Sequence, residues 1–153
     1  MQAKEIMTEA PACCTPEDRA EEAARLMHEN DCGAIPVVEE QGSHRLVGVV
    51  TDRDIAVRGV AQGRGPETRV SELMTSEPEC CPEDADVHEV EDVMKRKQVR
   101  RVPIIDARGE LVGIIAQADL ARSHGDEITD EEVGEVVERI SEPGRRVRSA
   151  QAD

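Results

Sequence analysis

The sequence contains no Phe, Trp or Tyr, so its core must be built from Val, Ile, Leu, Met, Ala and Cys. Any bound base would therefore lie between aliphatic side chains. Hydrophobic residues are also scarce, at 38% of the chain, which is low for a globular domain. The 153 residues nevertheless suffice for one compact domain or two small interlocked halves. A chain of this size buries about 68–70% of the surface that its unfolded state exposes, so its stability needs no disulfide or metal.

Long apolar runs are also absent, since the longest, such as 46–50, are far shorter than a membrane-spanning helix. The first residues include acids and no extended apolar segment, so we expect no secretory signal. Five cysteines, an odd number, do not suggest the disulfide framework of a secreted domain. The net charge of −15 repels polyanions and argues against broad nucleic-acid binding. We therefore expect a cytoplasmic protein that binds neither membranes nor nucleic acids.

An internal repeat organises the chain. The segment EIMTEAPACC, which begins at Glu5, recurs as ELMTSEPECC, which begins at Glu72. Further on, LVGVVTDRDIA at 46–56 matches LVGIIAQADLA at 111–121. We therefore predict a first repeat at 1–58, a linker at 59–68 and a second repeat at 69–123.

Each repeat shows the same order of predicted elements. Apolar residues three and four positions apart predict a helix, as around Met27 in the first copy. Two short strands rich in branched residues follow, at 35–38 and 46–50 in the first copy and at 102–105 and 111–115 in the second. The segment after each second strand opens another helix, whose free backbone N–H groups favour an anion. We predict an α/β (α+β) fold of two tandem β-α-β-β-α repeats that pack sheet to sheet with pseudo-twofold symmetry.

Beyond the second repeat, residues 124–142 are predicted to form a C-terminal helical extension. Thr129 is its expected N-cap, and Glu132 three residues later would complete a capping box. Its apolar stripe contains Val133, Val136, Val137 and Ile140. Residues 143–153, which open with Pro-Gly, are predicted to be a disordered tail.

These motifs resemble those of a known family. I-M-T near the start, an apolar-Pro-apolar strand and G-h-h-T-x-x-D at the end are similar to cystathionine-β-synthase-type (CBS) domain pairs, also called Bateman modules. The resemblance covers about residues 3–123, and the lack of a large additional domain makes the chain similar to stand-alone bacterial hypoxic-response CBS proteins. The resemblance implies that an adenine nucleotide or related adenosyl ligand binds in clefts between the repeats, and that the chain pairs into flat homodimers.

Within GVVTDRD, Asp54 matches the residue that holds the ribose in this family. The two adjacent ribose hydroxyls can each donate a hydrogen bond to an ionised carboxylate. Thr51, at the predicted strand-to-helix turn, is expected to contact phosphate through its hydroxyl and backbone N–H, and Arg53 supplies a nearby cation. The alternative interpretation is that Thr51 caps a helix and that Asp52 and Asp54 enrich its first turn.

A run of five cations in seven residues, from Lys95 to Arg101, stands out in this acidic chain. Lys95 and Arg96 are explained by the C-terminus of a helix, whose dipole favours cations. Arg100 and Arg101 lie beyond the expected helix end, and the resemblance implies that they reach the phosphates. The adenine would then rest against Val49, Pro78 and Glu79.

The pseudo-symmetric second cleft is weaker. Asp119 matches Asp54, but alanines replace the threonine and the arginine that precede Asp54, and Gly33-Ala34 replace the arginine pair. We therefore predict one competent nucleotide site and one degenerate cleft, lined by Pro11, Ala12, Ala34, Ile114, Ala116 and Asp119.

The vicinal pairs Cys13-Cys14 and Cys80-Cys81 raise the question of a thiol or metal site. Neighbours on a strand point to opposite faces, so one cysteine of each pair should face inward. Vicinal cysteines lack the spacing of common zinc sites, and the four histidines (His28, His44, His88 and His124) are interpreted as surface residues, so no metal site is predicted.

The sequence contains no motif that pairs a nucleophile with a base, so we do not expect an enzyme. The leading hypothesis is a regulatory sensor with no obligatory cofactor that binds AMP, ADP or ATP and signals through dimer contacts or an unknown effector protein. One alternative is a ligand-free homodimer that presents the 133–140 helix to a partner. The other is a thiol or metal sensor that uses the cysteine pairs.

Overall fold

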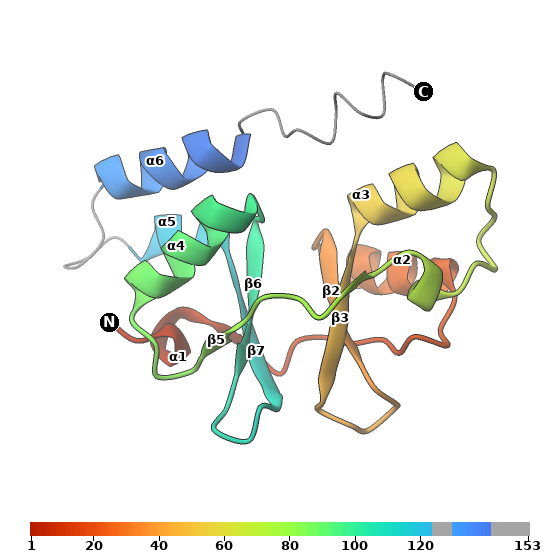
Figure 1. The fold of residues 1–153 in the computed structure, drawn as a ribbon, viewed down its shortest axis with the longest axis horizontal. Helices are drawn as coiled ribbons and strands as arrows, with labels where there is room; N and C mark the ends of the chain where they lie inside the picture. Colours follow the sequence, from red (N-terminus) through yellow and green to blue (C-terminus); the bar gives the residue numbers. More distant parts are fainter. Residues whose placement is uncertain (124–129, 142–153) are drawn as a thin grey trace.

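The computed structural model describes residues 1–123 and 130–141, which form two halves that lie side by side (Figure 1). The first elements are α1 (Ala3–Ile6), β1 (Thr8–Glu9), α2 (Ala20–Glu29), β2 (Ala34–Val38), β3 (Leu46–Thr51) and α3 (Asp52–Asp54). A π-helical turn at Ile55–Gly59 continues α3, and 3₁₀ turns follow at Val60–Gln62 and Val70–Glu72. The remaining elements are β4 (Thr75–Ser76), β5 (Cys81–Pro82), α4 (Val87–Lys97), β6 (Arg101–Ile105), β7 (Leu111–Ala116), α5 (Gln117–Arg122) and α6 (Asp130–Ser141).

The strands form two sheets, with the orders β2-β3-β4 and β1-β7-β6-β5. In Figure 1 the strands β2, β3, β6 and β7 occupy the middle of the molecule, with α2 and α3 beyond one sheet and α4 and α5 beyond the other. This arrangement confirms the predicted pair of β-α-β-β-α repeats. None of the helices in the described ranges is long and apolar enough to cross a membrane.

Each sheet contains a short strand from the other repeat, an exchange that the sequence does not predict. The N-terminal β1 pairs antiparallel with β7, with Thr8 opposite Ile114, and β4 pairs antiparallel with β3, with Thr75 opposite Val49. Glycines make room for both contacts. A Cβ on Gly48 would lie 2.9 Å from the carbonyl oxygen of Thr75, and one on the equivalent Gly113 would lie 3.0 Å from that of Thr8. The exchange interlocks the repeats, so neither sheet is complete without the other half.

Two apolar clusters form the core, one behind the sheet of each half. The first contains Cys14, Ala20, Ala23, Met27, Ile35, Val37, Val50, Val70 and Leu73. The second contains α4 residues, among them Val87, Val90 and Met94, with strand residues such as Ile104 and Ile115. The helical positions spaced three and four apart in the sequence are therefore buried, as predicted, except Ala24 of α2, which is exposed.

Helix α6 covers the second cluster and has no equivalent behind the first sheet among the described residues. Val136 and Ile140 are buried against that cluster, and Val133 packs beside them. Val137 is exposed, so its placement in the apolar stripe was wrong: it follows Val136 directly, and neighbouring residues on a helix diverge by about 100°. Thr129 and the predicted tail lie outside the described residues.

Candidate functional site

Asp54 and Thr51 form a reciprocal cap where β3 passes into α3. Asp54 N donates to Thr51 Oγ1 at 3.0 Å, and Thr51 N donates to Asp54 Oδ2 at 2.9 Å. The capping interpretation is therefore correct for both side chains. The cap leaves hydrogen-bonding groups available, because it uses neither the Thr51 hydroxyl hydrogen nor the lone pairs of Asp54 Oδ1. Both groups can still bind a ligand.

Arg58 connects Asp54 to the second repeat. Its Nε lies 3.9 Å from Asp54 Oδ1, and its Nη1 donates to the carbonyl oxygens of Leu73 at 3.1 Å and Met74 at 3.0 Å. The chain at 73–74 leads directly into β4. Sequence reasoning missed this arginine: its position four residues after Asp54 signals the ion pair within one helical turn, but nothing in the sequence signals the bonds to the two carbonyls.

The expected adenine contacts lie at the edge of β3. Because Thr75 pairs with Val49 and Glu77 N donates to the Val47 carbonyl at 3.2 Å, Pro78 follows directly at this edge. Val49 and Pro78 are half-buried. Val49 therefore lies on the same strand as Thr51, two residues before it, whereas Pro78 follows a pairing that runs toward Val47 and the other end of β3. Arg53 is exposed on the first turn after it.

Glu79 is bound to the end of α4. Its carboxylate pairs with the Arg96 guanidinium and with Lys97 Nζ, the latter at 3.3 Å. Partial desolvation favours the neutral acid, but hydrogen bonds from Lys97 and Arg96 outweigh it and lower the pKa of Glu79. Glu79 thus links the segment that follows β4 to the last turn of α4, shortly before β6 begins at Arg101.

Arg100 and Arg101 lie past the end of α4, as predicted, at the start of β6. Arg100 is exposed and Arg101 half-buried, and neither guanidinium has an acidic partner in the described part of the chain. Figure 1 shows the start of β6 and α3 at the same end of the two sheets. No hydrogen bond or ion pair joins Asp54 to either arginine among the described residues. Within its own sheet, Arg101 lies opposite Ala116.

The second cleft repeats this geometry with fewer polar groups. Ala116 N donates to Asp119 Oδ2 at 2.7 Å, and Asp119 Oδ1 accepts from Arg122 at 2.9 Å. Ala34 lies opposite Thr51 in the first sheet, and the buried Ile114 lies opposite Thr8 in the second. Pro11 and Ala12 follow β1, whose residue pairing places them beside β7.

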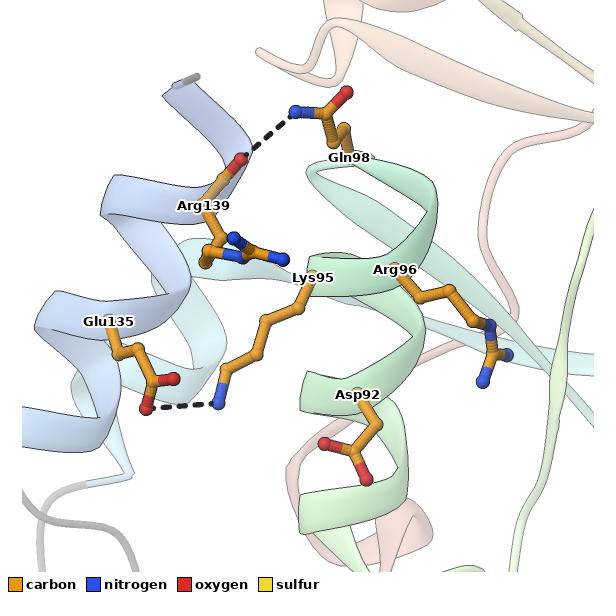
Figure 2. Close-up of a pocket in the computed structure, with 6 residues that line it drawn as sticks. All are labelled: Asp92, Lys95, Arg96, Gln98, Glu135 and Arg139. Carbon is orange, nitrogen blue, oxygen red and sulfur yellow. Dashed lines mark hydrogen bonds and ion pairs between the residues drawn. The ribbon is translucent and has the colours of Figure 1, made fainter. Parts of the chain in front are cut away.

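Two cavities lie away from Asp54. One, of about 580 Å³, lies between residues 7–15, the loop 41–44 and Leu111, and it includes Pro11 of the second cleft. The other, of about 630 Å³, lies between α4 and α6 (Figure 2). There Lys95 Nζ lies 3.3 Å from Glu135 Oε2, and Gln98 donates to the Arg139 carbonyl at 3.3 Å. The ion pair of Lys95 therefore helps to hold α6 against α4.

The cysteine pairs have one buried member each, as predicted. Cys14 is 2% exposed and Cys81 3%, whereas Cys13 and Cys80 are half-buried. Burial is the main cause that raises the pKa of Cys14 to about 12 and that of Cys81 to about 11. Burial also raises the pKa of Cys13 and of Cys80. These four thiols stay protonated at neutral pH, which disfavours reactive thiolates.

Comparison with known proteins supplies the family. The chain matches the family described as CBS domain twice, over residues 3–59 and 70–125. The CBS domain-containing protein YhcV of Bacillus subtilis is 41% identical over 138 residues, which is 90% of this chain and 94% of that protein.

Solved structures agree. Hypoxic Response Protein I, solved with two coordinated zinc ions, is 36% identical, with a TM-score of 0.74 over 82% of this chain and 100% of that one. The CBS domain pair of protein MJ0100, solved in complex with 5′-methylthioadenosine and S-adenosyl-L-methionine, is 28% identical, with a TM-score of 0.71 over 80% of this chain and 94% of that one. The resemblance seen in the repeated motifs is therefore confirmed, and the chain belongs to the CBS domain family.

Proposed function

We propose that this protein is a regulatory module that binds an adenosine-containing ligand between its repeats, beside Asp54. The ligand class follows from the family and from protein MJ0100, a relative solved with two adenosine derivatives. Asp54 would hold the ribose through Oδ1, and the aliphatic edge formed by Val49 and Pro78 would pack against the base.

The observation that carries the finer proposal is the unpaired state of Arg100 and Arg101. In a chain with 34 acidic residues, the neighbouring Lys95, Arg96 and Lys97 all have carboxylate partners, whereas these two have none among the described residues. Guanidinium groups suit phosphate oxygens, which they bind through two parallel hydrogen bonds. We therefore infer a phosphate-bearing ligand, AMP, ADP or ATP, in preference to an uncharged adenosyl compound.

A thermal-shift panel tests the ligand class. AMP, ADP, ATP, S-adenosylmethionine and 5′-methylthioadenosine are added at about 100 times Kd, where a ligand stabilises by about 2.7 kcal/mol. For a chain of this size that raises the melting temperature by about 5–10 °C. Since Trp and Tyr are absent, unfolding is followed by circular dichroism or an external dye. The proposal fails if no adenosine derivative shifts the transition, and a ligand-free interaction module then takes its place.

Matched variants test the residues. Asp54→Asn keeps an acceptor for the cap and should weaken nucleotide binding at least tenfold, whereas Asp119→Asn should leave it unchanged. The Arg100→Ala/Arg101→Ala variant should weaken AMP binding strongly and 5′-methylthioadenosine binding little. Arg108→Ala, which removes an exposed arginine from the turn after β6, is the charge control. Equal losses for both ligands would show that the arginines do not bind phosphate.

Binding between interlocked halves would alter their relative tilt, and with it the contacts of a homodimer or of an effector protein. A ligand can shift such an equilibrium only by its differential affinity for the two states. A module of this kind that responds to AMP, ADP or ATP would report the energy state of the cell. Analytical ultracentrifugation with and without the bound nucleotide measures whether the protein is a dimer and whether the ligand changes its association.

A further inference from the structure

A buried carboxylate on α4 lacks a partner. The side chain of Glu91 is 3% exposed, and its Oε1 has no hydrogen-bond partner among the described residues. An oxygen of this kind is costly to bury unless a donor or a cation compensates it. One helical turn earlier stands His88, and Glu132 faces it from α6. Ligand atoms of these three residues all lie within 4.8 Å of one another.

A fourth residue orients the histidine. Asp86, the N-cap of α4, accepts through Oδ1 from the backbone N–H of His88 at 2.9 Å and contacts His88 Nδ1 at 2.6 Å. The ring is thereby held with Nε2 toward Glu132, whose Oε1 lies 3.3 Å away. A carboxylate on one ring nitrogen, with the other nitrogen directed at further ligands, is the usual outer-sphere support of a metal-binding histidine.

We propose that His88 Nε2 and the carboxylates of Glu91 and Glu132 bind a divalent zinc ion between α4 and α6. Imidazole with carboxylates is a donor set that suits zinc, whereas magnesium and calcium prefer oxygen ligands alone. Three protein ligands leave the fourth tetrahedral position for water. The site uses no cysteine, so it is separate from the thiol pairs considered above.

A proton on His88 is a poorer solution for the same cluster. A protonated ring could donate from Nε2 to Glu132, but Glu91 Oε1 would stay without a partner. A cation at the centre of the three groups contacts all of them at once and offsets two carboxylates. The buried and unpartnered oxygen of Glu91 therefore favours a metal ion over a simple ion pair.

The position of the site gives it a structural consequence. Contacts in the middle and the last turn of α6 already hold it to α4, through Glu135 with Lys95 and through the Arg139 carbonyl with Gln98 (Figure 2). Glu132 lies in the first turn of α6. Zinc would fix this first turn to α4 and so make the docking of α6 dependent on the metal.

Isothermal titration of the EDTA-treated full chain with zinc tests the proposal, with manganese, magnesium and calcium as comparators. We expect one zinc ion per chain at this site and no measurable binding of magnesium or calcium. His88→Ala and Glu132→Gln should abolish this binding, and Glu91→Gln should weaken it at least tenfold. Asp86→Asn, which remains a good N-cap, should weaken it about 10- to 100-fold. Glu89→Gln, an exposed α4 residue outside the cluster, and His44→Ala in the other half are the controls.

Two further readouts separate this site from a thiol site and from a merely structural cluster. Cobalt bound here should show no sulfur-to-cobalt charge-transfer absorption, because all ligands are nitrogen and oxygen. Zinc should slow hydrogen exchange in α6 of the wild type but not of His88→Ala. A sulfur band, zinc binding that survives His88→Ala, or wild-type affinity in Glu91→Gln would each overturn the proposal. Because Asp54 is not involved, nucleotide binding can be scored independently.

Discussion

The two repeats share one backbone design, but among the described residues only the first connects its aspartate to the other half. Asp54 belongs to a cap completed by the Thr51 hydroxyl, and Arg58 carries the connection to the carbonyls at 73–74. In the second repeat Ala116 offers no hydroxyl, and Arg122 bonds to Asp119 on its own helix. The two repeats thus share a scaffold, while the described contacts that lead from the aspartate to the other half belong to the first repeat.

The apolar clusters of the two halves are completed by different segments of the chain. The second cluster gains Val136 and Ile140 from α6, whereas the first is closed by Val70 and Leu73 from the segment that enters β4. The first half therefore depends on the connection between the repeats for its core. The second depends on the C-terminal helix.

The largest expected effect follows from this dependence. Leu73→Ala removes a fully buried side chain and should lower the free energy of unfolding by about 2–5 kcal/mol. Its repeat equivalent, Ile6, is only partly buried, so Ile6→Ala should cost less. Urea denaturation followed by circular dichroism measures both. Equal losses would mean that the segments before β1 and before β4 contribute equally to stability, contrary to the comparison.

The exchanged strands give the next prediction. A Cβ on Gly48 would stand 2.9 Å from the Thr75 carbonyl oxygen, a backbone atom that cannot move without shifting β4. Gly48→Ala should therefore destabilise by about 1–3 kcal/mol. Gly113→Ala should cost a similar amount, because a Cβ there would lie 3.0 Å from the Thr8 carbonyl oxygen and against the Met7 side chain, as one on Gly48 would lie against Met74. Thermal unfolding measures both losses, and a neutral Gly48→Ala would show that β4 is loosely paired.

Much of this fold could be predicted because its signals are local. The predicted strand 35–38 is observed as Ala34–Val38, and 111–115 as Leu111–Ala116, since branched apolar runs with flanking turns mark strands directly. The exchange could not be predicted in the same way. β1 and β4 have two residues each, all exposed, so they carry no alternating pattern from which a pairing could be inferred.

The residues of the candidate sites show the same contrast between local sequence signals and contacts between separate elements. The repeat itself pointed to Thr51 and Asp54, because the motif stands in a fixed place after a strand. Arg58 was missed because its partners are main-chain carbonyls, which have no signature in a sequence. Glu91 and Glu132 come from different helices, and no fixed motif spacing connects them. Packing between separate elements decides such contacts.

A smaller effect on stability is expected from the arginines that bond to the aspartate of each repeat, Arg58 and Arg122. Arg58→Ala removes hydrogen bonds to two carbonyls and should cost about 1 kcal/mol, since its side chain is 40% exposed and partly screened. Arg122, which is 76% exposed and bonded to Asp119 on its own helix, should contribute about 0.2–0.5 kcal/mol. Chemical denaturation of both alanine variants measures the contrast. Arg58→Lys should recover only part of the loss, because lysine lacks the planar fork.

The finest difference between the halves lies in their buried thiols. Cys14 and Cys81 are almost equally buried, but the pKa of Cys14 is about 12 and that of Cys81 about 11. Alkylation proceeds through the thiolate, so Cys81 should be modified faster than Cys14 at pH 8, as scored by peptide mass spectrometry. Both rates should rise about tenfold at pH 9, because the thiolate fraction grows with pH below the pKa. If both cysteines react at one rate that is independent of pH, global unfolding limits the reaction. The local environments of the two repeats would then be indistinguishable by this measure.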